Sequence, residues 1–192
     1  MKFNLPNALT WFRVVAIPLV VAVFFGPELF DWQESWTRPA AGLLFGLAGI
    51  TDYFDGYLAR RLGLTSSFGA FLDPVADKLI VSTALVLLVQ ADPHVSLALV
   101  AAIIIGREIT VSALREWMSQ IGARAHVAVS IFGKWKTTLQ IIGISLMLYR
   151  EPLLTLPVYR IGEWLVYVAA ALTLWSMIDY VRAAWPAMRA QE

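Results

Sequence analysis

Cysteine is absent from the 192-residue sequence. Its absence excludes disulfides, zinc–thiolate and iron–sulfur centres, and thiol nucleophiles. Charged residues are scarce as well, since Asp, Glu, Lys and Arg make up 15% of the chain, against about a quarter in soluble domains. The net charge of +1 lacks the large positive excess with which proteins bind nucleic-acid phosphates. We therefore expect no nucleic-acid partner and no site that depends on a cysteine thiol.

Apolar residues dominate instead, at 59% of the chain, and the mean hydropathy is +0.67. This excess is larger than one small water-soluble core can bury, so the composition predicts a domain that sits in lipid. The apolar residues form runs without the alternation of barrel strands. Each run approaches the roughly 20 residues of a membrane-crossing helix. The sequence therefore predicts a single all-α integral membrane domain over 1–192 with six transmembrane helices, at 8–26, 37–58, 70–91, 95–116, 128–149 and 161–183.

The positively charged residues indicate which helix ends face the cytoplasm. If the six helices alternate in direction, all but three of the 15 Lys and Arg residues fall on one side. The exceptions are Arg38, Arg150 and Arg160. Because loops rich in Lys and Arg stay in the cytoplasm, we expect both termini and the connections around 60–78 and 107–136 to be cytoplasmic.

Four aspartates stand close together in the sequence: Asp52, Asp55, Asp73 and Asp77. The first pair is three residues apart at the end of one apolar stretch, and the second pair is four apart at the start of the next. Both spacings place a pair on one helix face. An ionised carboxylate at membrane depth costs about 2.5–3.5 kcal/mol unless it is paired. Oxygen ligands alone suit Mg²⁺, Mn²⁺ or Ca²⁺, and the alternative is a merely solvated helix end.

Small residues share the face of the first pair. At 100° per residue, Gly56, Ala59 and Arg60 lie on the same side of a helix as Asp52 and Asp55. The two small residues leave room beside a metal, and an arginine suits a phosphate. This combination favours a pyrophosphate-bearing ligand; the alternative is that Gly56 and Ala59 only permit close helix packing.

The second pair continues the pattern, because Gly69, Asp73 and Asp77 recur every four residues and align on one face. Pro74 follows Asp73, an order that predicts a helix start with Asp73 near the N-cap and Pro74 in the first turn.

The residues together read D-x₂-D-G-x₂-A-R-x₈-G-x₃-D-x₃-D, with every spacing intact from Asp52 to Asp77. This pattern resembles the signature of the CDP-alcohol phosphatidyltransferase family. The segments NLPNALTWFRVVAIP, GREITVSALREW and GKWKTTLQ are similar to the bacterial branch whose acceptor is sn-glycerol 3-phosphate. The resemblance covers nearly the whole chain.

The resemblance implies transfer of the phosphatidyl group from CDP-diacylglycerol to sn-glycerol 3-phosphate, giving phosphatidylglycerophosphate and CMP. It also implies two Mg²⁺ or Mn²⁺ ions, a homodimer, membrane lipids as neighbours, and the bacterial cytoplasmic (inner) membrane. The active site is expected at the cytoplasmic membrane interface, because CDP and glycerol phosphate are aqueous whereas the diacyl tails are not.

The resemblance also implies roles for individual residues. Asp52, Asp55, Asp73 and Asp77 would hold metal, and Asp77 would in addition take the proton of the acceptor hydroxyl as the catalytic residue. The nucleotide-bearing donor would be bound by Gly56, Ala59, Arg60, Gly69, Asn7 and Thr10.

Asn7 and Thr10 lie three residues apart with Arg13 following at the same interval, so the three share a helix face. Helix capping explains the first two residues nearly as well as donor binding. Arg13 is expected to extend toward a phosphate of lipid or substrate.

The acceptor phosphate needs cations, and the candidates are Arg107, Arg115 and Lys134, with Lys136 a weaker one. Arg107 ends an unbroken apolar run and should face the interior, with Glu108 as its counter-ion. The alternative for these cations is anchoring to anionic lipid headgroups.

Three other functions remain open. Within the family, the acceptor is open between glycerol 3-phosphate and an inositol phosphate, serine or phosphatidylglycerol. A divalent-cation transporter also places carboxylates in a membrane, but such proteins carry repeats and polar residues through the bilayer. Here the acidic residues cluster at one face and no repeat is found. A non-catalytic assembly subunit would not need a complete metal motif.

Overall fold

The computed structural model describes residues 5–62, 67–121 and 131–189. Side chains are described within these ranges except at 5–9, 52–62, 67–68, 70, 131–134 and 187. The described chain is helical, with no strand beyond one isolated bridge between Leu153 and Leu156. The helices are α1 (Leu5–Phe24), α2 (Gly26–Phe30), α3 (Glu34–Leu62), α4 (Ser67–Ala91), α5 (Val95–Gln120), α6 (Ile131–Tyr149) and α7 (Val158–Arg189).

One long helix covers most of the described residues of each predicted apolar stretch, which confirms the all-α class for the described part of the chain. Within the part of the chain that the structure describes, two of these helices are long and apolar enough to cross a membrane, over Val95–Gln120 and Val158–Pro186. Thr10–Phe24 is a shorter apolar helix. The six-helix topology and the cytoplasmic termini stay predictions.

Large apolar side chains point outward along the long helices. Examples are Leu43 of α3, Val86 of α4, Leu99 of α5 and Trp175 of α7, all of them exposed. Outward apolar side chains on so many helix faces are unfavourable in water and typical of a surface that contacts lipid. The exposed face therefore agrees with the membrane location expected from the composition.

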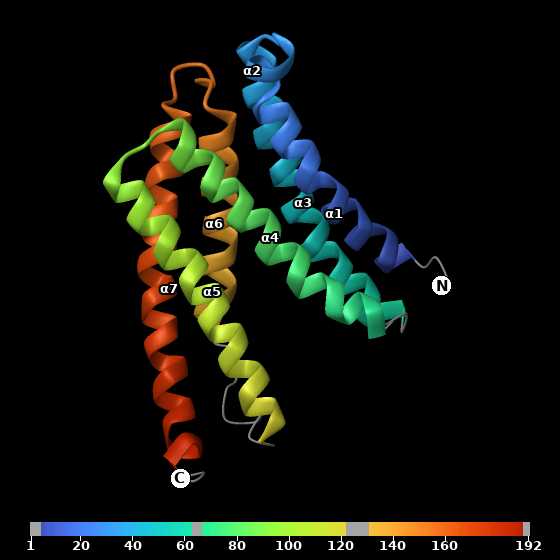
Figure 1. Ribbon diagram of the computed structural model, residues 1–192, viewed down its shortest axis with the longest axis vertical. Helices are drawn as coiled ribbons and strands as arrows, with labels where there is room; N and C mark the ends of the chain where they lie inside the picture. Colours follow the sequence, from blue (N-terminus) through green and yellow to red (C-terminus); the bar gives the residue numbers. More distant parts are fainter. Residues whose placement is uncertain (1–4, 63–66, 122–130, 190–192) are drawn as a thin grey trace.

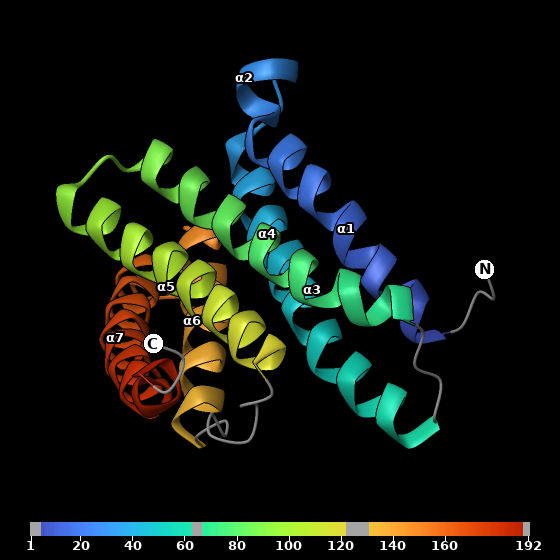
Figure 2. The same cartoon turned by 60° about the horizontal axis from the view of Figure 1, so that its bottom comes forward.

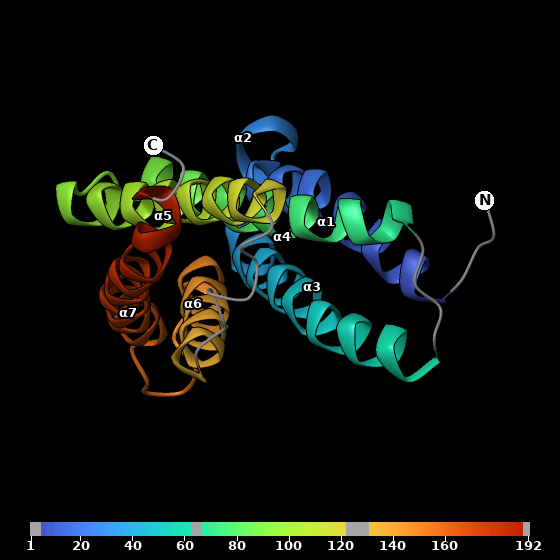
Figure 3. The same cartoon turned by 90° about the horizontal axis from the view of Figure 1, so that it is seen from below.

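The helices form two groups that share one core. α1 packs along α3 and α4, whereas α6 packs along α7 and α5 packs along α7 and α4. α3 also packs on α6 and so connects the two groups. The start of α1, the end of α3 and the start of α4 gather at one corner (Figure 2). α5, α6 and α7 lie on the other side of the bundle (Figure 3), and the ends of α5 and α7 extend beyond the start of α6 (Figure 1).

A continuous apolar cluster fills the space between the helices and leaves their polar ends outside it. Every long helix contributes a side chain that is almost fully buried. These are Val20, Phe45, Leu85, Ile104, Ile144 and Val166.

The expectation that Asp73 lies near a helix N-cap is wrong. α4 begins at Ser67, so Pro74 lies inside the helix rather than in its first turn. A proline inside a helix removes one backbone hydrogen bond and costs about 3 kcal/mol or more. The earlier start adds turns before Asp73 and places Gly69, Asp73 and Asp77 on one continuous helix.

Helices α6 and α7 approach each other closely at two glycines. A Cβ atom added to Gly162 would lie 2.6 Å from the carbonyl oxygen of Gly143, a backbone atom that cannot move aside. Small residues at such a crossing let two helix backbones come together. By contrast, a Cβ atom at Gly106 of α5 would meet nothing within 4 Å.

Substitution by alanine is therefore expected to have opposite effects on stability at Gly162 and at Gly106. We expect Gly162→Ala to lower the free energy of unfolding by about 1–3 kcal/mol, because it overpacks the α6–α7 crossing. Gly106→Ala, the matched control, should leave stability unchanged or raise it by up to about 1 kcal/mol through helix propensity. Thermal unfolding in detergent measures both; equal effects would contradict the packing role of Gly162.

Candidate functional site

The second pair of predicted metal ligands faces α1. Arg13 of α1 donates from Nη2 to Oδ1 of Asp73 at 2.6 Å, and from Nη1 to Oδ1 of Asp77. Thr10, one turn before Arg13, donates its hydroxyl to the same Oδ1 of Asp73 at 3.2 Å. The structure thus brings Thr10, Asp73 and Asp77 together and adds Arg13 between the two carboxylates.

The three charged groups differ in burial. Arg13 is 0% exposed, whereas the side chains of Asp73 and Asp77 are 36% and 42% exposed. A buried guanidinium is tolerated when anions pair with it. Arg13 therefore offsets the charge of both carboxylates from inside the protein, while the carboxylates themselves remain accessible.

Asp73 and Asp77 fit a hard divalent cation. They offer carboxylate oxygens from successive turns of one helix, and both are accessible, which suits Mg²⁺ or Mn²⁺. Among the side chains that the structure describes, no group of three or more metal-binding residues occurs. The side chains of Asp52 and Asp55 lie outside that set, so the four-aspartate centre stays a prediction.

Other predicted donor-site residues also lie outside the described side chains. The backbone places Asp52, Asp55, Gly56, Ala59 and Arg60 in the last turns of α3, which packs against both α1 and α4. Asn7 lies in the first turns of α1, and Gly69 lies one turn before Asp73 on α4.

Sequence reasoning missed the main role of Arg13. It expected the side chain to extend toward a phosphate, whereas the structure pairs it with two carboxylates. A signal was present, because Thr10 and Arg13 share a face of α1 and the aspartates require nearby cations. The sequence did not indicate which of several cations would supply that charge.

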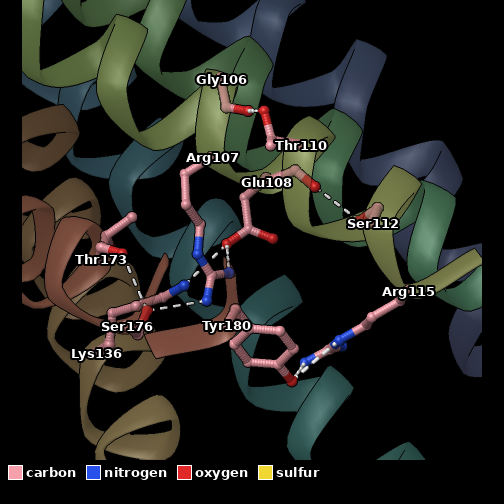
Figure 4. A network of polar contacts seen from close by, with 10 residues as sticks. All are labelled: Gly106, Arg107, Glu108, Thr110, Ser112, Arg115, Lys136, Thr173, Ser176 and Tyr180. Carbon is pink, nitrogen blue, oxygen red and sulfur yellow. Dashed lines mark hydrogen bonds and ion pairs between the residues drawn. The ribbon is translucent and has the colours of Figure 1, made fainter. Parts of the chain in front are cut away.

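A second polar cluster connects α5, α6 and α7 (Figure 4). Oε1 of Glu108 accepts hydrogen bonds from Nη1 of Arg107 at 2.8 Å and from Nζ of Lys136 at 2.9 Å. Nη2 of Arg107 donates to Oγ of Ser176 at 3.0 Å. Arg107 is buried, so the expectations that it faces the interior and pairs with Glu108 are confirmed.

Arg115 lies two turns after Arg107 on α5, and its side chain is exposed. Its Nε and Nη2 donate to the hydroxyl oxygen of Tyr180 at 3.2 and 2.5 Å, and its guanidinium carbon lies 5.1 Å from the Tyr180 ring centre. Tyr180 follows Ser176 by one turn of α7, so α7 contacts both arginines (Figure 4). The side chain of Lys134 lies outside the described residues.

The two clusters carry opposite charge on neighbouring helices. The carboxylates of α4 suit cations, whereas the cluster around Arg107, Arg115 and Lys136 has an excess of positive charge and suits an anion. α4 packs against α5. The two clusters therefore lie on helices that are in contact.

The chain is similar to known proteins over nearly its whole length. The family model for CDP-alcohol phosphatidyltransferase matches residues 3–175. The chain is 48% identical over 184 residues to a protein of Escherichia coli (strain K12), covering 96% of each chain. A protein of Shigella flexneri serotype 5b (strain 8401) matches equally well. Both relatives are named CDP-diacylglycerol–glycerol-3-phosphate 3-phosphatidyltransferase.

The position of Arg13 predicts a coupled effect on stability. Arg13→Gln leaves Asp73 and Asp77 without their described cation, and we expect the free energy of unfolding in metal-free buffer to fall by about 1–3 kcal/mol. Asp77→Asn should cost much less in the Arg13→Gln background than in the wild type, because the two residues act as a pair.

Thermal unfolding of the two single variants and the double variant in detergent measures this coupling. Arg182→Gln, an exposed arginine of α7, is the control and should change little. Additive losses from Arg13→Gln and Asp77→Asn would contradict the pairing.

Proposed function

The chain belongs to the CDP-alcohol phosphatidyltransferase family, and we propose how its residues carry out the reaction. It transfers the phosphatidyl group from CDP-diacylglycerol to sn-glycerol 3-phosphate and releases CMP. The observation that supports this activity is 48% identity over 96% of the chain to relatives named for the same reaction. The match to the family model, which includes the motif from Asp52 to Asp77, confirms the resemblance found in the sequence.

In this reaction the acceptor hydroxyl forms a new bond to the phosphorus that carries diacylglycerol, and the bond from that phosphorus to CMP breaks. Little covalent help is needed, so the protein acts chiefly by positioning and by charge stabilisation. Two Mg²⁺ or Mn²⁺ ions would neutralise the diphosphate and the leaving CMP. We propose that Asp52, Asp55, Asp73 and Asp77 hold them.

Asp77 is our candidate for the general base that takes the acceptor's proton. A base needs access to the hydroxyl and must be ionised. The Asp77 side chain is 42% exposed, and its pairing with Arg13 through Oδ1 limits its rotation. Thr10 and Arg13 would order Asp73 in the same way.

The remaining donor contacts follow from the family motif. Gly56 and Ala59 would leave space for the cytidine beside the metal ligands, and Arg60 would bind the nucleotide phosphates. Asn7 and Gly69 would line the donor side, at the ends of α1 and α4 that gather in Figure 2.

The acceptor phosphate would bind at the positive cluster of α5, α6 and α7. Arg107, Arg115 and Lys134 supply its charge in this proposal. Arg115 is exposed and its guanidinium lies beside Tyr180. A phosphate dianion gains most from such cations where lipid excludes water.

We also propose the membrane arrangement. The single domain would cross the bacterial inner membrane six times as a homodimer, with both termini and the site on the cytoplasmic side. The polar ends of the helices support this placement, because the water-soluble acceptor arrives from the cytosol whereas the donor's acyl chains stay in lipid.

The acceptor is tested directly with purified protein in detergent, CDP-diacylglycerol and Mg²⁺, by following CMP release. Glycerol 3-phosphate should be used far better than serine, because the positive cluster favours a phosphorylated acceptor. It should also be used better than an inositol phosphate or phosphatidylglycerol, because the relatives are named for glycerol 3-phosphate. Chelation of divalent ions should abolish release. Preference for another acceptor would overturn the assignment, and full activity in chelator would overturn the metal proposal.

Asp77→Asn should lower kcat by about 10²–10⁴-fold, the usual contribution of a general base. Binding of CDP-diacylglycerol, measured by its protection against thermal unfolding, should persist. The exposed Asp179 of α7 provides the control, and Asp179→Asn should keep full turnover. Normal turnover in Asp77→Asn would remove Asp77 as the base.

A further inference from the structure

One carboxylate oxygen connects two buried cations in the positive cluster. Oε1 of Glu108 lies 2.8 Å from Nη1 of Arg107 and 2.9 Å from Nζ of Lys136. Arg107 is 8% exposed and Lys136 is 3% exposed, whereas the Glu108 side chain is 27% exposed. Two cations held so close repel each other in an apolar bundle. Glu108 offsets this repulsion and so permits both cations to lie there.

The other end of Arg107 is anchored to α7. Its Nη2 donates to Oγ of Ser176 at 3.0 Å, and that hydroxyl donates in turn to the carbonyl oxygen of Thr173 at 3.0 Å. A serine hydroxyl has one proton. Because Ser176 gives it to Thr173, the serine oxygen is oriented as an acceptor for Arg107 (Figure 4).

These contacts distinguish Arg107 from Arg115. Both terminal nitrogens of Arg107 donate within the protein, to α5 through Glu108 and to α7 through Ser176. Arg115, by contrast, is exposed and contacts only α7 in the described hydrogen bonds. The position of the Arg107 guanidinium is therefore fixed by contacts on two helices.

We infer that Glu108 is a positioning residue of the acceptor site: through Oε1 it holds Arg107 and Lys136 together, and Ser176 completes the anchor of Arg107 on α7. The inference rests on the proposed function, because it places the acceptor phosphate at this cluster. Glu108 joins α5 to α6 and Arg107 joins α5 to α7. The positive charge offered to the phosphate thus has one fixed geometry.

The Glu108→Gln variant distinguishes two explanations, because an effect of net charge and a loss of positioning change the affinity for the acceptor phosphate in opposite directions. The substitution adds one positive charge to the cluster, so long-range attraction would strengthen binding of a phosphate dianion. Positioning predicts weaker binding, because an amide holds neither cation as a carboxylate does.

The experiment measures steady-state kinetics of the full chain in detergent with CDP-diacylglycerol and glycerol 3-phosphate varied separately. Glu108→Gln should raise the KM for glycerol 3-phosphate by about tenfold, the loss expected for a charge-assisted hydrogen bond. The KM for the donor should change less than about twofold, within the scatter expected of an uninvolved site. Glu108→Asp keeps the charge and should restore part of the acceptor affinity.

A double variant tests whether Glu108 acts through its partner. In a Lys136→Met background, Glu108→Gln should raise the acceptor KM much less than in the wild type, since the contact it serves is already gone. Glu116→Gln is the matched control: Glu116 is an exposed acid on the same helix, and its loss should leave both KM values unchanged.

Ser176→Ala provides an independent measurement that changes no charge. It removes the α7 anchor of Arg107 and should raise the acceptor KM severalfold while sparing the donor KM. This variant decides the question if Glu108→Gln does not fold, as judged by thermal unfolding.

An unchanged or lowered acceptor KM in both Glu108→Gln and Ser176→Ala, with an active wild type, would overturn the positioning role and leave the proposed function intact. A wild type that does not use glycerol 3-phosphate would instead overturn the proposed function, and the inference with it. A rise confined to the acceptor KM supports both.

Discussion

The pairing of Arg13 with Asp73 and Asp77 is the interaction on which the candidate site depends. Carboxylates one turn apart repel each other, and burying their charge in an apolar helical bundle is unfavourable. A guanidinium inserted from α1 offsets that charge and leaves the carboxylates accessible to solvent. It also joins α1 to α4, whose contact forms one wall of the site.

The same principle operates with reversed charge in the second cluster. There one acid, Glu108, offsets Arg107 and Lys136, and the excess charge is positive. The bundle therefore separates its charge by sign, with acidic side chains in the first half of α4 and basic side chains in the second half of α5. In the proposed reaction, the acidic side chains of α4 would hold the cations that bind the donor diphosphate, whereas the basic cluster would bind the acceptor phosphate directly.

Much of the fold was predictable from local pattern. Each apolar stretch became one long helix, because a run of about 20 apolar residues can satisfy its backbone hydrogen bonds only within itself in lipid. The Arg107–Glu108 pair was also predictable, because the two residues are adjacent in the chain. The start of α4 was not. The rule that places proline in the first turn describes a preference, and α4, which packs against α1, continues through Pro74.

Local pattern was enough to predict the helices, the shared face of Asp73 and Asp77, and the family motif, since all of these depend on residues within a few turns of each other. Which cation meets which acid depends instead on how the helices pack. Arg13 lies 60 and 64 residues from its partners, and Ser176 lies 69 residues from Arg107. Such contacts depend on how far each helix slides and rotates against its neighbours, and that is set by the fit of whole apolar faces rather than by any short segment.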